Sequence, residues 1–145
     1  MKTKQADLWF SFVRAHRIII RKIETKLSEA KLPIYAWYDV LWGLESGENG
    51  TRRMHELADV VVIERYNLTR LIDRLEKEDL VIRSRSDDDR RASFATITEK
   101  GKLLRKQMWE IYREVVKTHF LSQFSETEIN DFANALDNAA LSAKD

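Results

Sequence analysis

The chain contains no cysteine, one proline and four glycines among its 145 residues. The absence of cysteine excludes a thiol nucleophile, a thiolate metal site and a disulfide framework. The scarcity of glycine and proline favours long, uninterrupted helices. An excess of one charge is also lacking, because 25 Lys and Arg oppose 24 Asp and Glu. Whole-chain charge therefore attracts neither nucleic acid nor a membrane, and any such attraction must come from a local surface.

A long hydrophobic run is missing as well. The stretch from Ala15 to Ile20 is interrupted by His16 and Arg17, so it matches neither a signal peptide nor a membrane span. We expect a cytoplasmic protein without membrane contact, folded as one domain over residues 1–145. A chain of this length buries enough surface to need no metal or other cofactor for folding.

Apolar residues at a three-to-four spacing predict most of the helices. The spacing favours a helix over residues 6–30, a second from Pro33 to Gly47, and a short third from Arg52 to Val60. The next helix, over residues 64–78, is strongly amphipathic. Its apolar side consists of Leu68, Leu71, Ile72 and Leu75.

The remainder of the chain predicts a hairpin followed by two helices. Segments 80–85 and 92–98 have strand-like composition and flank a polar tip at residues 86–91, which favours a two-stranded hairpin. A helix is expected over residues 99–121. Another follows Ser125, where Ser125 and Glu128 have the spacing of a capping box.

The two ends of the chain carry opposite charge. Residues 1–33 hold eight basic and three acidic side chains, whereas residues 123–145 hold one basic and five acidic ones. The terminal helices also have wider apolar faces than a small centre can cover. We therefore expect residues 6–30 and 99–142 to pack across a homodimer. Packing of these helices within one chain is the alternative.

The central elements form the pattern of a winged helix-turn-helix, in which the amphipathic helix enters the DNA major groove and the hairpin reaches a minor groove. The expected fold is mainly α, with residues 34–98 as the DNA-binding lobe, a small β-hairpin wing, and long N- and C-terminal dimerisation helices. Double-stranded DNA is the expected partner. The candidate DNA contacts are Arg53, Arg65, Tyr66, Asn67, Thr69, Arg70, Arg74, Asp89, Arg90 and Arg91.

The charge of this region alone does not favour DNA binding. Residues 52–92 contain ten basic and ten acidic side chains, so the prediction depends on how these charges are segregated. The acids Glu76, Glu78 and Asp79 cluster at the end of the helix that would point away from DNA. The alternative is a solvated helix with ion pairs such as Arg70 to Asp73.

The sequence resembles the MarR family of bacterial dimeric winged-helix regulators. The similarity covers residues 34–101 and extends to the flanking helices by their length and placement. Its most specific parts are His-Glu-Leu-Ala at 55–58, Leu-Thr-Arg-Leu at 68–71 through Leu75-Glu76, Asp-Arg-Arg at 89–91, and Ile-Thr at 97–98 before Gly101.

The resemblance implies a homodimer whose recognition helices occupy successive major grooves. It implies that Arg91 probes a minor groove and that Asp89 braces it. Three positions depart from the family pattern: Val62 replaces a small turn residue, Glu64 replaces a serine at the helix start, and Asp79 replaces a glycine at the helix end. Glu64 can still cap the helix, although its charge would repel a phosphate. Asp79 tolerates a left-handed cap.

The resemblance also places an effector pocket where the first two helices meet the DNA-binding lobe. We expect His16 and Arg17, near Trp37 and Tyr38, to hold a small anionic aromatic molecule. The alternative is that these aromatic side chains belong to the core.

Two motifs suggest metals but fit them poorly. The segment from His55 to Asp59 has an aspartate where a zinc protease needs its second histidine. The three aspartates at 87–89 lack the glycine and glutamate of a calcium loop. We therefore expect no metal, no catalytic residue and no enzymatic activity. The leading prediction is a ligand-released DNA-binding repressor. The alternatives are a DNA-binding regulator or architectural protein without an effector, and an enzyme or interaction module.

Overall fold

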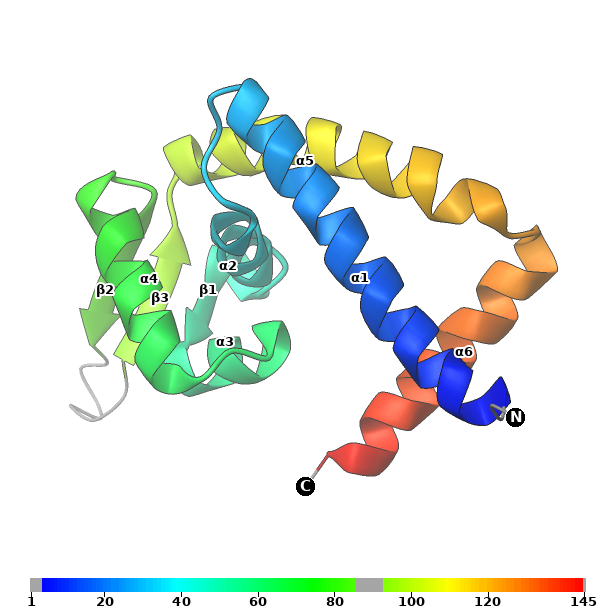
Figure 1. The fold of residues 1–145 in the computed structure, drawn as a ribbon. Helices are drawn as coiled ribbons and strands as arrows, with labels where there is room; N and C mark the ends of the chain where they lie inside the picture. Colours follow the sequence, from blue (N-terminus) through cyan, green and yellow to red (C-terminus); the bar gives the residue numbers. More distant parts are fainter. Residues whose placement is uncertain (1–3, 86–92, 145) are drawn as a thin grey trace. The chain divides into compact units, whose positions relative to one another are not determined.

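The computed structural model describes residues 4–85 and 93–144 and is mainly helical (Figure 1). Its elements, in chain order, are α1 (Lys4–Glu29), α2 (Tyr35–Glu45), η1 (Glu48–Gly50), β1 (Thr51–Arg53), α3 (Met54–Val61), α4 (Arg65–Lys77), β2 (Val81–Arg85), β3 (Ser93–Ile97), α5 (Glu99–His119), η2 (Leu121–Gln123) and α6 (Glu126–Ala143). The chain divides into two units, which we describe separately. One is Glu24–Ile111, and the other combines Met1–Ile23 with Tyr112–Asp145.

The central unit is built on a continuous apolar core. Helix α4 buries the face predicted from its sequence: Leu68, Ile72 and Leu75 are buried, and Leu71 packs against the same core. Helix α2 and the sheet supply the other main contributors, which are Val40, Leu41, Leu44, Val81, Ala95 and Ile97. Each fully buried aliphatic side chain of this kind stabilises the fold by about 1.5–3 kcal/mol.

The sheet has three strands where the sequence predicted two. Its order is β1-β3-β2, and both pairings are antiparallel. The extra strand β1 pairs Thr51 with Thr96, and their hydroxyl oxygens lie 2.8 Å apart. Because β1 takes up Thr51–Arg53, α3 starts at Met54, and the prediction of a helix from Arg52 was wrong at this end.

Residues in the left-handed backbone conformation make the sharp turns on either side of α4. Val62, between α3 and α4, has φ 54°, and Asp79, after α4, has φ 61°. The left-handed cap predicted for Asp79 is thus confirmed. Glu64 occupies the N-cap position in extended conformation, but its side chain makes no capping hydrogen bond, so the expected side-chain cap is not formed. A β-branched residue such as Val62 is strained in this conformation.

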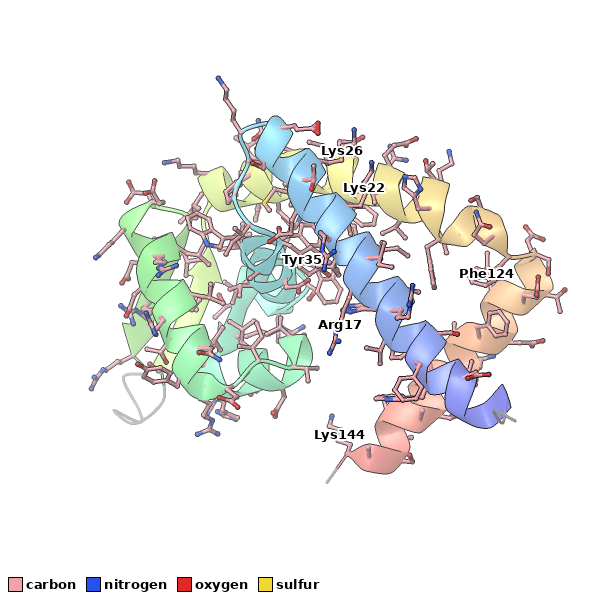
Figure 2. All side chains as sticks on the ribbon, viewed as in Figure 1. Arg17, Lys22, Lys26, Tyr35, Phe124 and Lys144 are labelled. Atoms are coloured by element: carbon pink, nitrogen blue, oxygen red, sulfur yellow. The ribbon has the colours of Figure 1, made fainter. Side chains whose placement is uncertain are left out.

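The terminal unit contains the start of α1, the end of α5, and α6. The predicted capping box is confirmed, because the Ser125 hydroxyl accepts from the Glu128 backbone N–H while the Glu128 carboxylate accepts from the Ser125 N–H. Phe124, labelled in Figure 2, meets the rings of Phe120 and Phe132 edge-on at centroid distances of 5.1 and 5.2 Å. None of the α6 residues is buried.

Large apolar side chains are exposed along both terminal helices of this unit. On α1 they include Leu8, Trp9 and Phe10, which are 72%, 63% and 63% exposed. On α6, Phe132 and Leu136 are 46% and 45% exposed. This is far more apolar surface than isolated exposed residues contribute in a monomer. No helix within residues 4–85 and 93–144 combines the length and the apolar character that a membrane crossing requires.

Candidate nucleic-acid interface

The solvent-exposed face of α4 brings together six of the predicted DNA contacts. Opposite the buried leucines, this helix exposes Arg65, Tyr66, Asn67, Thr69, Arg70 and Arg74. Guanidinium, amide and hydroxyl groups are the donors and acceptors that bind base edges and phosphates. We call these six residues the α4 polar face.

Contacts within α4 hold parts of this face in place. The Arg70 guanidinium lies over the Tyr66 ring, with Cζ 5.7 Å from its centroid. The Thr69 hydroxyl donates a 2.9 Å hydrogen bond to the Arg65 carbonyl. Thr69 therefore keeps its lone pairs for outside donors, while its proton is used within the helix.

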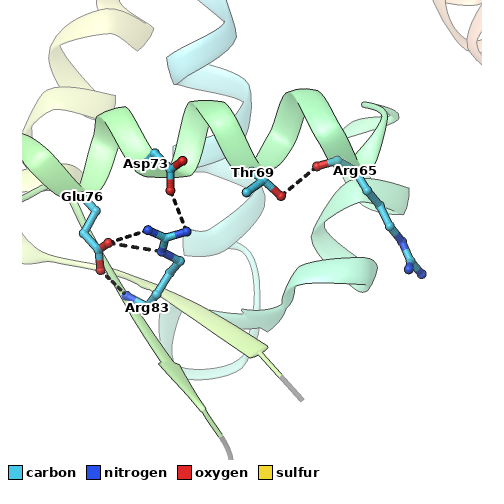
Figure 3. A network of polar contacts seen from close by, with 5 residues as sticks. All are labelled: Arg65, Thr69, Asp73, Glu76 and Arg83. Carbon is cyan, nitrogen blue, oxygen red and sulfur yellow. Dashed lines mark hydrogen bonds and ion pairs between the residues drawn. The ribbon is translucent and has the colours of Figure 1, made fainter. Parts of the chain in front are cut away.

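The strongest polar network joins α4 to β2 through Arg83 (Figure 3). Its Nε and Nη2 donate to Glu76 Oε1 at 3.1 and 2.9 Å, and its backbone N–H donates to Glu76 Oε2 at 3.1 Å. Arg83 Nη1 lies 2.7 Å from Asp73 Oδ1. We call Arg83, Asp73 and Glu76 the Arg83 brace.

The brace has an electrostatic consequence. Hydrogen bonds from the Arg83 backbone and side chain lower the pKa of the Glu76 carboxyl group below its usual value, and the Glu76 carboxylate raises that of Arg83. The hydrogen bonds and the ion pair of the brace tie the C-terminal half of α4 to β2, the first strand of the hairpin.

Sequence reasoning missed this network. The sequence offered an ion pair from Arg70 to Asp73 as an alternative. The structure instead pairs Asp73 with Arg83 and places the Arg70 guanidinium over the Tyr66 ring. The available signal was one basic residue, Arg83, within the predicted strand 80–85 and close in sequence to the acids at the end of the preceding helix. Only the α4–β2 packing shows that it faces two carboxylates.

Two neighbouring arginines on β1 point to different partners. Arg53 lies over the Phe94 ring at 5.3 Å and pairs with Glu56 at 3.9 Å. Arg52 instead donates from Nε to the Gly43 carbonyl at 2.6 Å, at the C-terminal end of α2. A cation there stabilises the negative end of the helix dipole, so Arg52 serves the fold and Arg53 faces the interface.

The predicted wing tip, residues 86–91, lies outside the described residues. Asp89, Arg90 and Arg91 therefore stay predictions. The strands that lead to the tip, β2 and β3, are paired over their whole length from Val81 with Ile97 to Arg85 with Ser93.

The predicted effector residues fall on both units. His16 and Arg17 are exposed on α1 in the terminal unit, and Trp37 and Tyr38 lie on α2 in the central unit. Within the central unit, Tyr38 is buried and stacks on Trp109, with ring centroids 5.9 Å apart. This contact supports the alternative for Tyr38, namely that its side chain belongs to the core.

A partly buried carboxyl group adjoins these aromatics on α2. Burial raises the pKa of Asp39 from 3.8 to about 6, although a hydrogen bond with the Tyr35 side chain opposes the rise. At neutral pH the helix therefore holds a carboxylate in a place that disfavours its charge. Within the described part of the chain, no group of three or more His, Asp and Glu side chains is placed to hold a metal ion.

Comparison with known proteins gives one consistent result. The sequence model of the MarR family matches residues 38–93. The transcriptional regulator SarZ of Staphylococcus aureus is 34% identical over 132 residues, covering 91% of this chain and 85% of SarZ.

Solved structures show the same fold. The MarR-family regulator Sco3205 from Streptomyces coelicolor, determined in complex with DNA, has a TM-score of 0.91 at 20% identity, covering 100% of this chain and 94% of that one. NadR, determined in complex with 4-hydroxyphenylacetate, has a TM-score of 0.75 at 24% identity, covering 97% of this chain and 96% of that one.

Proposed function

The chain belongs to the MarR family of transcriptional regulators, and from that premise we propose that it is a homodimeric repressor that binds a pseudo-palindromic DNA operator. In this proposal a small molecule releases the repressor from DNA. The residues of the DNA-binding lobe, 34–98, contact the operator, and residues 6–30 with 99–142 form the dimerisation lobe. No catalytic residue is assigned.

The α4 polar face is the observation that carries the proposal. An amphipathic helix with its leucines buried and three arginines exposed is suited to enter a major groove. Arg65, Asn67, Thr69 and Arg70 match the exposed recognition-helix positions of the family. The Arg83 brace supports the same assignment, because it fixes this helix against the strand that leads to the wing.

Each wing is proposed to reach a minor groove through Arg91, with Asp89 as its brace and Arg90 as a further DNA contact. Phosphate and minor-groove contacts add affinity with little sequence information. Replacing Arg91 with alanine should therefore weaken binding to all sequences, while the base preference set by α4 is retained.

The homodimer is proposed because the terminal unit exposes so much apolar surface. Leu136 on α6 is 45% exposed and Asn138, two residues further, is also exposed. Leu136→Lys should shift the mass in light scattering from dimer toward monomer, whereas Asn138→Lys should leave the dimer intact. A Leu136→Lys chain that stays dimeric would show that this face is not in the interface.

The effector is proposed to be a small anionic aromatic molecule held by His16, Arg17, Trp37 and Tyr38. NadR, which shares the fold, was determined with such a ligand. Tryptophan fluorescence titration with a panel of aromatic acids tests this site, and Trp37→Phe locates the signal. A second candidate function is a DNA-binding regulator without an effector, which is favoured by the buried stack of Tyr38 on Trp109.

The direct test of DNA reading is Arg70→Ala, compared with the wild type by anisotropy titration of a duplex selected from a random pool. Loss of a bidentate base contact should cost about 1–3 kcal/mol and relax the preference at one position per half-site. Lys77→Ala is the matched control, because it removes one exposed cation from the far end of the same helix. Equal effects of the two substitutions would contradict base reading by Arg70.

A further inference from the structure

A cleft of about 180 Å³ opens beside the first turn of α4. It is formed by four elements, since side chains from β1, α3, α4 and β3 line it. Its polar lining residues are Arg53, His55, Arg65, Thr69 and Ser93. No acidic side chain of the described residues lines this cleft.

The chemistry of the cleft suits a phosphate. Two guanidinium groups present forked donors that match the oxygens of an oxyanion, and an imidazole adds a donor on another side. Arg53 is already oriented by the Phe94 ring, at 5.3 Å. Its contact with Glu56 is long, at 3.9 Å, with both side chains about half exposed, so an arriving anion competes with a weak pair.

The position of the cleft identifies the source of that phosphate. Arg65 and Thr69 belong both to the cleft and to the α4 polar face. A helix that reads bases in the major groove has the sugar-phosphate backbone along its flank, and contacts to that backbone set the register of the helix. The inference rests on the proposed function, and it assigns the ligand as one phosphodiester of the operator.

We propose that this cleft seats a DNA backbone phosphate and that protonated His55 is one of its ligands, so that operator binding strengthens as the pH falls. His55 is the one histidine in this cleft, whereas His16 and His119 lie on α1 and α5. Histidine exchanges its proton between pH 5 and 8, and its charged form binds an anion more tightly. By linkage, the complex takes up protons and gains affinity as the pH is lowered.

The charged groups around His55 do not oppose this role once phosphate is bound. Arg53 from β1 and Arg65 from α4 share the cleft, and Ser93 from β3 is uncharged. On α3 itself, Glu56 and Asp59 are exposed neighbours. Neither acid lines the cleft, so a phosphate seated there meets Arg53, Arg65 and His55 and no carboxylate of the described residues.

The test is an anisotropy titration of the selected duplex at constant ionic strength from pH 8 to pH 5.5. We expect the wild-type affinity to rise about tenfold, the size of one good charge-assisted contact. His55→Gln should bind weakly with most of this rise removed, and His55→Lys should bind tightly with an equally flat profile. His119→Gln is the matched control and should keep the wild-type profile.

Comparing variants separates His55 from Asp39, whose pKa of about 6 places it in the same pH range. Profiles of His55→Gln or His55→Lys that follow the wild type would overturn the proposal. If no variant and no wild-type protein binds any duplex at any pH, the proposed function fails instead.

A second measurement identifies the phosphate as that of DNA. A series of duplexes, each carrying one neutral methylphosphonate, is titrated at pH 5.5 and pH 8. At one position per half-site we expect the wild-type pH dependence to disappear. If the pH dependence survives at every position, His55 does not meet a backbone phosphate.

Discussion

Removing the Arg83 side chain tests whether the wing and α4 are held together as described. Arg83→Met keeps the aliphatic stem of the side chain and removes its guanidinium group. The change deletes the contacts of Nε and Nη2 with Glu76 and of Nη1 with Asp73. It also leaves two carboxylates one turn apart on α4 without their shared cation, which is unfavourable on a helix.

The magnitude follows from the geometry and the exposure of the brace. Hydrogen bonds to charged groups contribute roughly 1.5–3 kcal/mol when buried, whereas exposed ion pairs contribute about 0.2–1 kcal/mol. The side chains of Arg83, Glu76 and Asp73 are 34%, 38% and 47% exposed. We therefore expect Arg83→Met to lower the free energy of unfolding by about 1–2 kcal/mol, between the exposed and the buried ranges.

The assay is thermal and urea unfolding of Arg83→Met, Glu76→Gln and the double variant. The double-mutant cycle isolates the coupling between the two side chains. Arg85→Met is the control, since Arg85 is exposed two residues along the same strand. A coupling energy near zero, or an equal effect of Arg85→Met, would refute the reasoning.

The same brace predicts a pH dependence with a definite sign. The contacts with Arg83 lower the pKa of Glu76 in the folded protein. Their stabilisation is present above the ordinary carboxyl pKa and is lost as the pH falls through the lowered folded value. The difference in stability between wild type and Arg83→Met should therefore be greatest near neutral pH and shrink below about pH 4.

Three further substitutions test other positions by thermal unfolding. Asp39→Asn should stabilise the protein near neutral pH by about 1–3 kcal/mol, since a rise in pKa from 3.8 to about 6 costs at most roughly 3 kcal/mol; an advantage that persists undiminished at pH 4 would contradict this cause. Val62→Asn should stabilise by about 1 kcal/mol, because Val62 is left-handed and 86% exposed; an unchanged melting temperature would mean that the turn is unstrained. Gly101→Ala should destabilise by about 1–3 kcal/mol, because a β-carbon there collides with the Leu80 carbonyl oxygen and lies 2.8 Å from Ile97 Cγ1; wild-type stability would exclude this close approach.

Elements with a repeated local signal could be predicted from the sequence. The apolar face of α4 repeats over about two turns, from Leu68 to Leu75, and the structure buries it as expected. The Ser125 and Glu128 pair is a local motif whose two hydrogen bonds need no tertiary partner. Asp79 is one of the few residue types that tolerate a left-handed cap, and it adopts one.

Features set by tertiary pairing could not be predicted in this way. Strand β1 is three residues long, too short to show an alternating pattern, and it exists because β3 offers it a partner. Arg52 and Arg53 are equivalent in the sequence, yet one caps α2 and the other lies over Phe94 because β1 directs them to different neighbours. The role of Arg83 likewise depends on the packing of α4 against β2.

The central claim is that the chain reads an operator through α4 as a two-fold symmetric dimer. Selection of bound duplexes from a random pool, followed by sequencing, tests it most directly. The account predicts an inverted repeat whose half-sites lie about 34–36 Å apart. When Arg70→Ala is used for the selection, the base preference at one position of each half-site should be relaxed. A pool that stays random with the wild-type protein, or an enriched motif without a repeat that Arg70→Ala leaves unchanged, would contradict it.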